Sequence, residues 1–160
     1  MRPRALLCLA FTAALAAPLA AAAQAAPRYV DIESYFTSDA QYEAWFTLTS
    51  QLDRNFDEIC GDTFCEGDYS NIQSLRYRCS VEQASGTIGR CIWLFAASNE
   101  DVDAMSGGFD VTRQFWRCRT PLAAHTRVDD FLAALAGDEP LYANLPDSPS
   151  SIYDGLVDCL

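Results

Sequence analysis

Residues 57–68 contain five acidic side chains, and four of them are candidates to hold a metal ion. Carboxylate oxygens are hard ligands of the kind that Ca²⁺ prefers, so the segment predicts a candidate calcium site. Its spacing is not that of an EF-hand loop. A solvated loop whose acids pair with arginine is the alternative that explains the same residues. The candidate ligands are Asp57, Asp62, Glu66 and Asp68.

A second candidate site combines arginine with aromatic residues at alternate positions of two segments. Residues 71–120 hold six arginines and five acids, whereas residues 28–70 hold two and ten, and residues 121–160 hold one and seven. Arginine and aromatic side chains on an open sheet face are typical of the centre of a protein interface. The same arginines could instead pair with acidic helices or lie in solvent, with little effect on stability. The candidate interface residues are Arg76, Arg78, Arg113, Phe115, Arg117 and Arg119.

Groups for covalent or acid–base catalysis are scarce. The chain has no lysine, which excludes a Schiff-base lysine and a P-loop lysine. The chain has one histidine, His125, and no G-x-S-x-G motif. We therefore assign no catalytic residue and no cofactor, apart from the calcium considered above. A hydrolase that uses paired carboxylates stays an alternative, because 22 acids allow many pairs.

The N-terminal segment, residues 1–25, has the parts of a secretory signal peptide. Arg2 and Arg4 precede an uncharged stretch rich in alanine and leucine, and the A-x-A motif at residues 23–25 offers a cleavage site. Pro18 and the many small alanines argue against a membrane anchor of similar length. We expect residues 26–160 to form one domain, in the periplasm or medium of a Gram-negative bacterium, without a stable membrane anchor.

The chain has seven cysteines, of which Cys8 falls in the signal peptide. Six cysteines in an exported chain of this size indicate three disulfides. Sequence alone leaves the pairing open. A hairpin register that places Cys79 opposite Cys91 also aligns aromatic residues across the two strands. The favoured pairs are Cys60–Cys65, Cys79–Cys91 and Cys118–Cys159.

Helical periodicity is clearest over residues 39–59. Apolar residues recur there at steps of three and four, and Ser38 with Gln41 has the spacing of a capping box. The pattern predicts a long amphipathic helix. Its apolar stripe comprises Tyr42, Trp45, Leu48, Leu52, Phe56 and Ile59.

Residues 72–119 change to the period of two that indicates strands. Turns at residues 85–86 and 105–108 divide them into an antiparallel meander whose last strand spans about 109–119. Residues 28–37 are a candidate fourth, short strand, or else an extended segment that leads into the helix. The expected cross-strand pairs are Cys79 with Cys91, Tyr77 with Trp93, and Leu75 with Phe95.

Two short helices are expected near the C-terminus, the first capped by Thr126 and the second opening at Ser148 and Pro149. The fold class is therefore α+β: a long N-terminal amphipathic helix and two short C-terminal helices packed on a three- or four-stranded antiparallel meander with three disulfides.

Net charge directs the expectation about function. The chain carries 11 basic and 22 acidic residues, a net of −11; without Arg2 and Arg4 it would carry 9 and 22, a net of −13. Such a chain is not a general nucleic-acid binder. We expect a small binding module, such as an inhibitor or immunity-type protein, whose acids steer a basic protein partner. The alternatives are a carboxylate- or calcium-dependent hydrolase and a structural component of the envelope.

Overall fold

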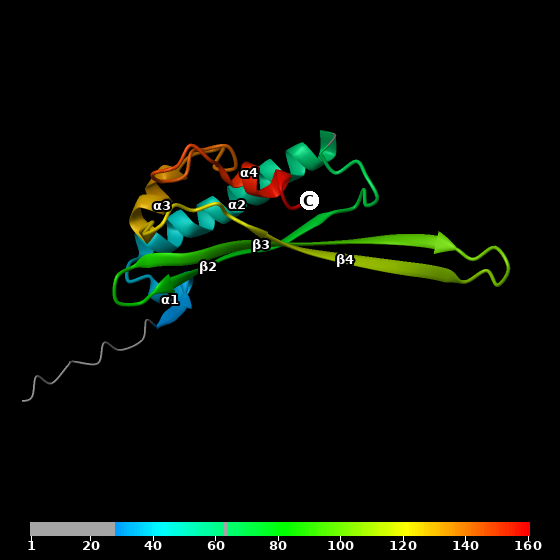
Figure 1. Cartoon of the computed structure of the whole chain (residues 1–160), viewed down its shortest axis with the longest axis horizontal. Helices are drawn as coiled ribbons and strands as arrows, with labels where there is room; N and C mark the ends of the chain where they lie inside the picture. The colour runs from blue at the N-terminus through cyan, green and yellow to red at the C-terminus, as the bar shows by residue number, and fades with distance from the viewer. Residues whose placement is uncertain (1–27, 63) are drawn as a thin grey trace, which may run out of the picture.

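The computed structural model describes residues 28–62 and 64–160 (Figure 1), and the predicted signal peptide lies outside them. The described chain forms a four-stranded antiparallel sheet in the order β1-β2-β3-β4, with α2, α3 and α4 on one side of it. The predicted α+β architecture is confirmed. A fourth strand is present, but it takes up only residues 29–31 of the candidate segment 28–37, and residues 32–35 form a short helix instead. The elements are β1 (Tyr29–Asp31), α1 (Ile32–Tyr35), α2 (Asp39–Asp62), β2 (Gln73–Glu82), β3 (Thr87–Val102), β4 (Phe109–Arg119), α3 (Val128–Ala134) and α4 (Ile152–Val157).

The long helix α2 begins behind a polar cap and extends to Asp62, three residues beyond the predicted end. The Gln41 N–H donates to Ser38 Oγ (3.4 Å), and the Gln41 side-chain oxygen accepts from the Thr37 N–H (3.0 Å). The two side chains thus satisfy backbone donors at the helix start. Tyr42 departs from the predicted stripe, because it is exposed and its hydroxyl donates to the backbone of α1. The buried stripe is Trp45, Leu48, Leu52 and Phe56.

All six cysteines of the described chain are paired as predicted. Cys60 bonds to Cys65, Cys79 to Cys91, and Cys118 to Cys159. The second pair joins directly opposed residues of β2 and β3, and the same register places Tyr77 opposite Trp93, as predicted. The third pair ties the end of β4 to the residues after α4, so it fixes the C-terminal helix to the sheet.

A β-bulge near the start of β2 changes the predicted register. Ser74, not Leu75, lies opposite Phe95, and Leu75 is left exposed, so the predicted pair is wrong. The bulge turns the Ser74 hydroxyl inward, where it accepts a hydrogen bond from Trp93 Nε1 (2.8 Å) and donates one to Asp53 (2.6 Å). A buried indole N–H needs such a partner, which gives the bulge a physical reason.

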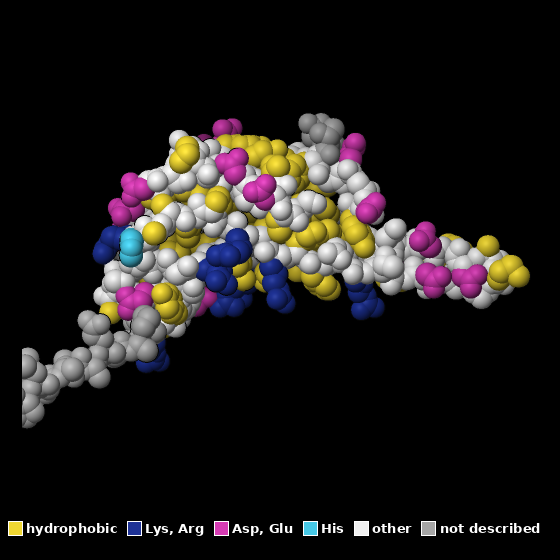
Figure 2. Space-filling model, viewed as in Figure 1, with side chains coloured by type: hydrophobic (Ala, Val, Ile, Leu, Met, Phe, Trp, Pro, Cys, Tyr) yellow, Lys and Arg dark blue, Asp and Glu magenta, His cyan; other side chains and the backbone are white. Residues whose placement is uncertain are grey.

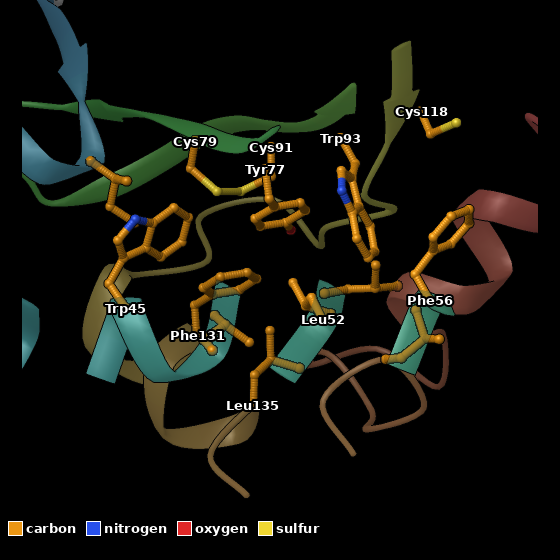
Figure 3. Close-up of a cluster of buried hydrophobic side chains, with 14 of the residues drawn as sticks. Trp45, Leu52, Phe56, Tyr77, Cys79, Cys91, Trp93, Cys118, Phe131 and Leu135 are labelled. Atoms are coloured by element: carbon orange, nitrogen blue, oxygen red, sulfur yellow. A yellow bond between two sulfur atoms is a disulfide. The ribbon is translucent and has the colours of Figure 1, made fainter. Parts of the chain in front are cut away.

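The core lies between α2 and the inner face of the sheet, and Figure 3 shows rings from both layers in contact. The ring centroids of Phe56 and Phe95 lie 4.7 Å apart, and those of Trp93 and Phe95 lie 4.9 Å apart. Phe131 and Leu135, from α3 and its C-cap, are buried in the same cluster, on the helical side of the sheet. Burial of each large apolar side chain contributes roughly 1.5–3 kcal/mol. These contacts hold the sheet against the helices.

The caps of the two C-terminal helices differ from those predicted. Thr126 does not cap α3: the N-cap is Arg127, without a side-chain cap, and the Thr126 hydroxyl donates to the carbonyl three residues earlier (2.9 Å). Helix α4 starts after Ser151, which forms a complete capping box, rather than at Ser148. Ser148 accepts from the N–H two residues on (3.1 Å). Neighbouring hydroxyls compete for local backbone groups, and spacing alone does not rank them.

The strands β3 and β4 continue beyond the rest of the sheet as a two-stranded arm, residues 98–113. Strand β2 pairs with β3 only as far as Gln73 and Ala96, whereas β3 and β4 stay paired up to Val102 and Phe109. Figure 1 shows this arm projecting from the body of the molecule. Strand β4 has the predicted bounds, but the projection of the arm was not predicted from the sequence.

Candidate protein interface

Alternation along β2, β3 and β4 places six arginines on the outer face of the sheet, opposite the core. Arg76 and Arg78 flank the buried Tyr77, and Arg117 and Arg119 flank the buried Cys118. All five predicted interface arginines are exposed on this face, and so is Phe115. We call this surface the open face. Its members are Arg76, Arg78, Arg90, Arg113, Arg117 and Arg119, with Leu75, Ile92, Leu94, Ala96, Val111 and Phe115 between them, and the acidic Glu100 opposite Val111 on the arm.

The strand register arranges these side chains in rows. Ile92 lies between Arg78 on β2 and Arg119 on β4. In the next row, Leu94 lies between Arg76 and Arg117. Each row is thus an aliphatic side chain flanked by two guanidinium groups, on strands that lie about 4.8 Å apart.

Two of the six arginines have ion-pair partners. Arg78 pairs with Asp31 of β1, and Arg76 lies 4.0 Å from Glu33 of α1. Among the described residues, the alternative in which the arginines pair with acidic helices therefore holds only for Arg76, which pairs with α1. Within residues 28–62 and 64–160, no ion pair is formed by Arg90, Arg113, Arg117 or Arg119.

A shallow apolar hollow opens in the open face at the base of the arm, with a volume of about 520 Å³. Leu75 and Phe115 contribute its largest apolar side chains, and they are 54% and 66% exposed. Ala96, directly opposite Phe115 on β3, has only a methyl group to fill the space. Arg113 and the acidic Glu100 also line the hollow. The hollow can accept an apolar side chain next to the guanidinium group of Arg113.

Two features of this site were missed from the sequence. Arg90 precedes Cys91 on β3, so the alternation that turns Cys91 inward should have placed Arg90 on the outer face with the others. The hollow depends on the outward turn of Leu75 at the bulge. The period-two pattern predicted the opposite orientation for Leu75.

Acidic side chains gather on the other parts of the molecule. Figure 2 shows magenta carboxylates over the helical layer and along the arm, and dark blue guanidinium groups along the underside of the sheet. The arm carries Asp101 and Asp110 directly opposite each other. Positive and negative side chains are therefore distributed unevenly: the described chain has a largely cationic sheet face and an acidic helical layer.

In the described part of the chain, the candidate calcium ligands do not form a cluster. Asp57 is exposed on α2, and Glu66 and Asp68 are exposed in the following loop, while the side chain of Asp62 lies outside the described part. No group of three or more potential metal ligands occurs in the part of the chain that the structure describes. A calcium site here stays a prediction from ligand chemistry.

Two titratable side chains, His125 and Tyr77, lie in very different surroundings. His125 is exposed, with a positive φ of 66°, at the turn before α3. Burial raises the pKa of Tyr77, which a hydrogen bond with Thr120 (2.7 Å) lowers in part. The Tyr77 ring is packed in the core between Trp45 and Trp93, so it is placed for stability.

The fold and this site together define a disulfide-bonded α+β protein with a cationic, partly apolar open sheet face. Among the described helices, none is long and apolar enough to cross a membrane. In comparisons with known proteins, no family model, no curated protein and no solved structure matches this chain.

Proposed function

We propose that this chain is an exported module that binds another protein through its open face. The observation that carries the proposal is the composition of that face: an apolar hollow lined by Arg113 lies beside rows of arginines, and four of the six arginines form no ion pair with the described residues. Interface centres combine an apolar anchor in a pocket with arginine. The N-terminal segment, with the sequence of a signal peptide, and the three disulfides support export, because disulfides persist in oxidising compartments.

The chemistry of the face specifies the contact surface of the partner. We expect an apolar side chain that enters the hollow beside Leu75 and Phe115. Neighbouring carboxylates of the partner would reach Arg113 in the hollow and Arg117, two residues further along β4 than Phe115. The expectation of a basic partner rested on the acids of the chain, which lie over the helical layer and the arm. A basic partner would dock there instead. We favour the open face because it combines charge with an apolar anchor site.

The acidic helical layer has a supporting role in this proposal. A partner with an acidic contact surface is repelled by the helices and attracted by the open face, so electrostatics selects one docking orientation. The disulfides and the core keep the open face preorganised, which lowers the entropy lost on binding. An inhibitor or immunity-type role, in which docking blocks the surface of an exported enzyme or toxin, is the form of binding that we propose.

The test is differential capture with charge-reversed variants. The chain is expressed with its full N-terminal sequence, purified oxidised, and immobilised through its N-terminal amine, since it has no lysine. Envelope and secreted proteins are passed over the original chain, over R117E/R119E, and over R54E/R127E. The last variant changes the net charge equally at positions outside the open face.

We expect one stoichiometric partner whose retention falls at least about tenfold with R117E/R119E, equivalent to about 1.4 kcal/mol, and is kept by R54E/R127E. A partner that binds the original chain and R117E/R119E equally would show that the open face is not the docking surface. Circular dichroism of each variant confirms that the fold is intact.

A further inference from the structure

We infer that the partner contributes an extended segment that pairs with β4 along its free edge and so adds a fifth strand to the sheet. This inference rests on the proposed function and specifies how the open face is engaged. The sheet has two edge strands of unequal length. Strand β1 at one edge has 3 residues, whereas β4 at the other edge has 11. Residues 73–79 of β2 continue the first edge beyond β1, but α1 packs beside β2 there and its Glu33 pairs with Arg76. The β4 edge is therefore the longer uncovered edge, with room for a strand of ordinary length.

The backbone of β4 is accessible over most of its length. Within the described chain, hydrogen bonds join the main chain of residues 109–117 only to β3. Helix α4 covers the final residues alone: a side-chain carbon at Gly155 would lie 2.5 Å from the Arg119 carbonyl oxygen, and Cys118 is bonded to Cys159. An unpaired edge of this kind is a template for main-chain pairing with another chain.

The side chains of this edge specify what can pair with it. Arg113, Phe115 and Arg117 alternate along β4 on the open face. Trp116 points to the other face, where its ring packs edge-on against that of Tyr69, with the ring centroids 5.7 Å apart. This contact determines which side chains of β4 point to the open face. A paired strand places its own side chains opposite these at the same period of two. The complementary segment therefore reads acid, any residue, apolar, any residue, acid, and this symmetric pattern fits either strand direction.

The same arginines argue against a second copy of this chain as the occupant. Two β4 edges brought together would place arginine-bearing strands side by side, and like charges on neighbouring strands are destabilising. Charged side chains on an edge strand are a common protection against self-association. The edge is thus unfavourable for its own sequence and favourable for an acidic strand.

The probe is the acetylated and amidated peptide Thr-Glu-Thr-Val-Thr-Glu-Thr, titrated into the oxidised full chain and followed by amide NMR shifts and hydrogen exchange. Two further peptides carry N-methyl groups on the odd or on the even backbone nitrogens. A strand uses every second N–H for pairing on one side, so one N-methylated form should bind like the parent and the other at least about tenfold more weakly. Exchange should slow for amides within residues 112–117.

The expected pairing of arginine on β4 with acids of the peptide is tested by reversing the charges on both. The variant R113E/R117E should lose the glutamate peptide and bind the same peptide with arginine in place of glutamate. Equal binding of the parent and both N-methylated peptides would overturn strand addition, because only side chains would then be in contact. Absence of binding of the parent peptide at millimolar concentration would overturn it too. Neither result depends on the capture experiment, which tests the open face as a docking surface by itself.

Discussion

The two faces of the sheet differ sharply in burial and in residue type, although the same strands form both. On the inner face, Trp93 and Phe95 are almost fully buried against α2. One residue away along the chain, Leu94 lies on the open face between Arg76 and Arg117. The alternation of side chains thus separates residues that stabilise the fold from residues that are free to bind. Substitutions on one face should leave the property of the other face unchanged.

The largest expected difference is between two phenylalanines. Phe95 is 0% exposed and Phe115 is 66% exposed. Phe95→Ala should lower the free energy of unfolding by roughly 3–5 kcal/mol because it leaves a core cavity. Phe115→Ala should change that free energy by at most about 0.5 kcal/mol, as surface substitutions do. Urea unfolding of both variants measures this, and losses of similar size would contradict the separation of the two faces.

Disulfide removal should rank by the length of the loop that each bridge closes. The sequence separations are 41 for Cys118–Cys159, 12 for Cys79–Cys91 and 5 for Cys60–Cys65. Chain entropy gives losses of about 4, about 3 and about 2 kcal/mol for the double alanine variants. Unfolding under identical oxidised conditions tests the order. The variant without the shortest loop should keep the open face and its binding intact.

Tyr77 links the inner face to pH. Tyr77→Phe removes the hydrogen bond to the buried Thr120 and should cost about 1–2 kcal/mol. Since burial raises the pKa of Tyr77, the neutral phenol is favoured in the folded state. Its contribution is complete below the unfolded pKa of about 10 and is lost as the pH rises through the folded pKa. The free energy of unfolding should therefore decline as the pH rises above about 10.

The control for this prediction is an exposed tyrosine. In Tyr77→Phe the alkaline decline in the free energy of unfolding should be smaller than in the original chain. In Tyr29→Phe, a substitution at a position 53% exposed, the decline should be unchanged. Identical pH profiles for the original chain and Tyr77→Phe would contradict a buried, neutral Tyr77.

The smallest expected effects on stability come from the arginines of the open face. Arg78→Ala breaks the pair with Asp31 and should cost up to about 1 kcal/mol, because both side chains are partly exposed. Arg90→Ala breaks no described ion pair and should be neutral to within about 0.5 kcal/mol. A loss above 2 kcal/mol for Arg90→Ala would show that the open face is needed for the fold.

Much of the fold could be predicted from residue spacing. The three- and four-residue steps after Ser38 specify α2, and the cysteine that opposes Cys79 specifies both a disulfide and a strand register. The bulge could not be predicted, because the inward turn of Ser74 depends on hydrogen bonds to Trp93 and Asp53 from distant segments. The N-cap of α4 was missed because several hydroxyls within four residues fit the same rule.

The candidate site could be predicted only in part. Alternation on β2 and β4 indicated five of the arginines of the open face, since period two follows directly from strand geometry. The hollow required the outward position of Leu75, and the free edge required the strand order and the length of β1. These are properties of pairing between segments, and a period read along one strand does not contain them.

Arginine footprinting of the complex is the most direct test of the open face as the binding surface. The oxidised chain, alone and with the captured partner, is treated with phenylglyoxal, and modification of each arginine is read by mass spectrometry. We expect the partner to protect Arg113, Arg117 and Arg119, while Arg54 and Arg127 stay reactive. Protection of Arg54 and Arg127, with the three arginines of β4 modified as in the free chain, would contradict it.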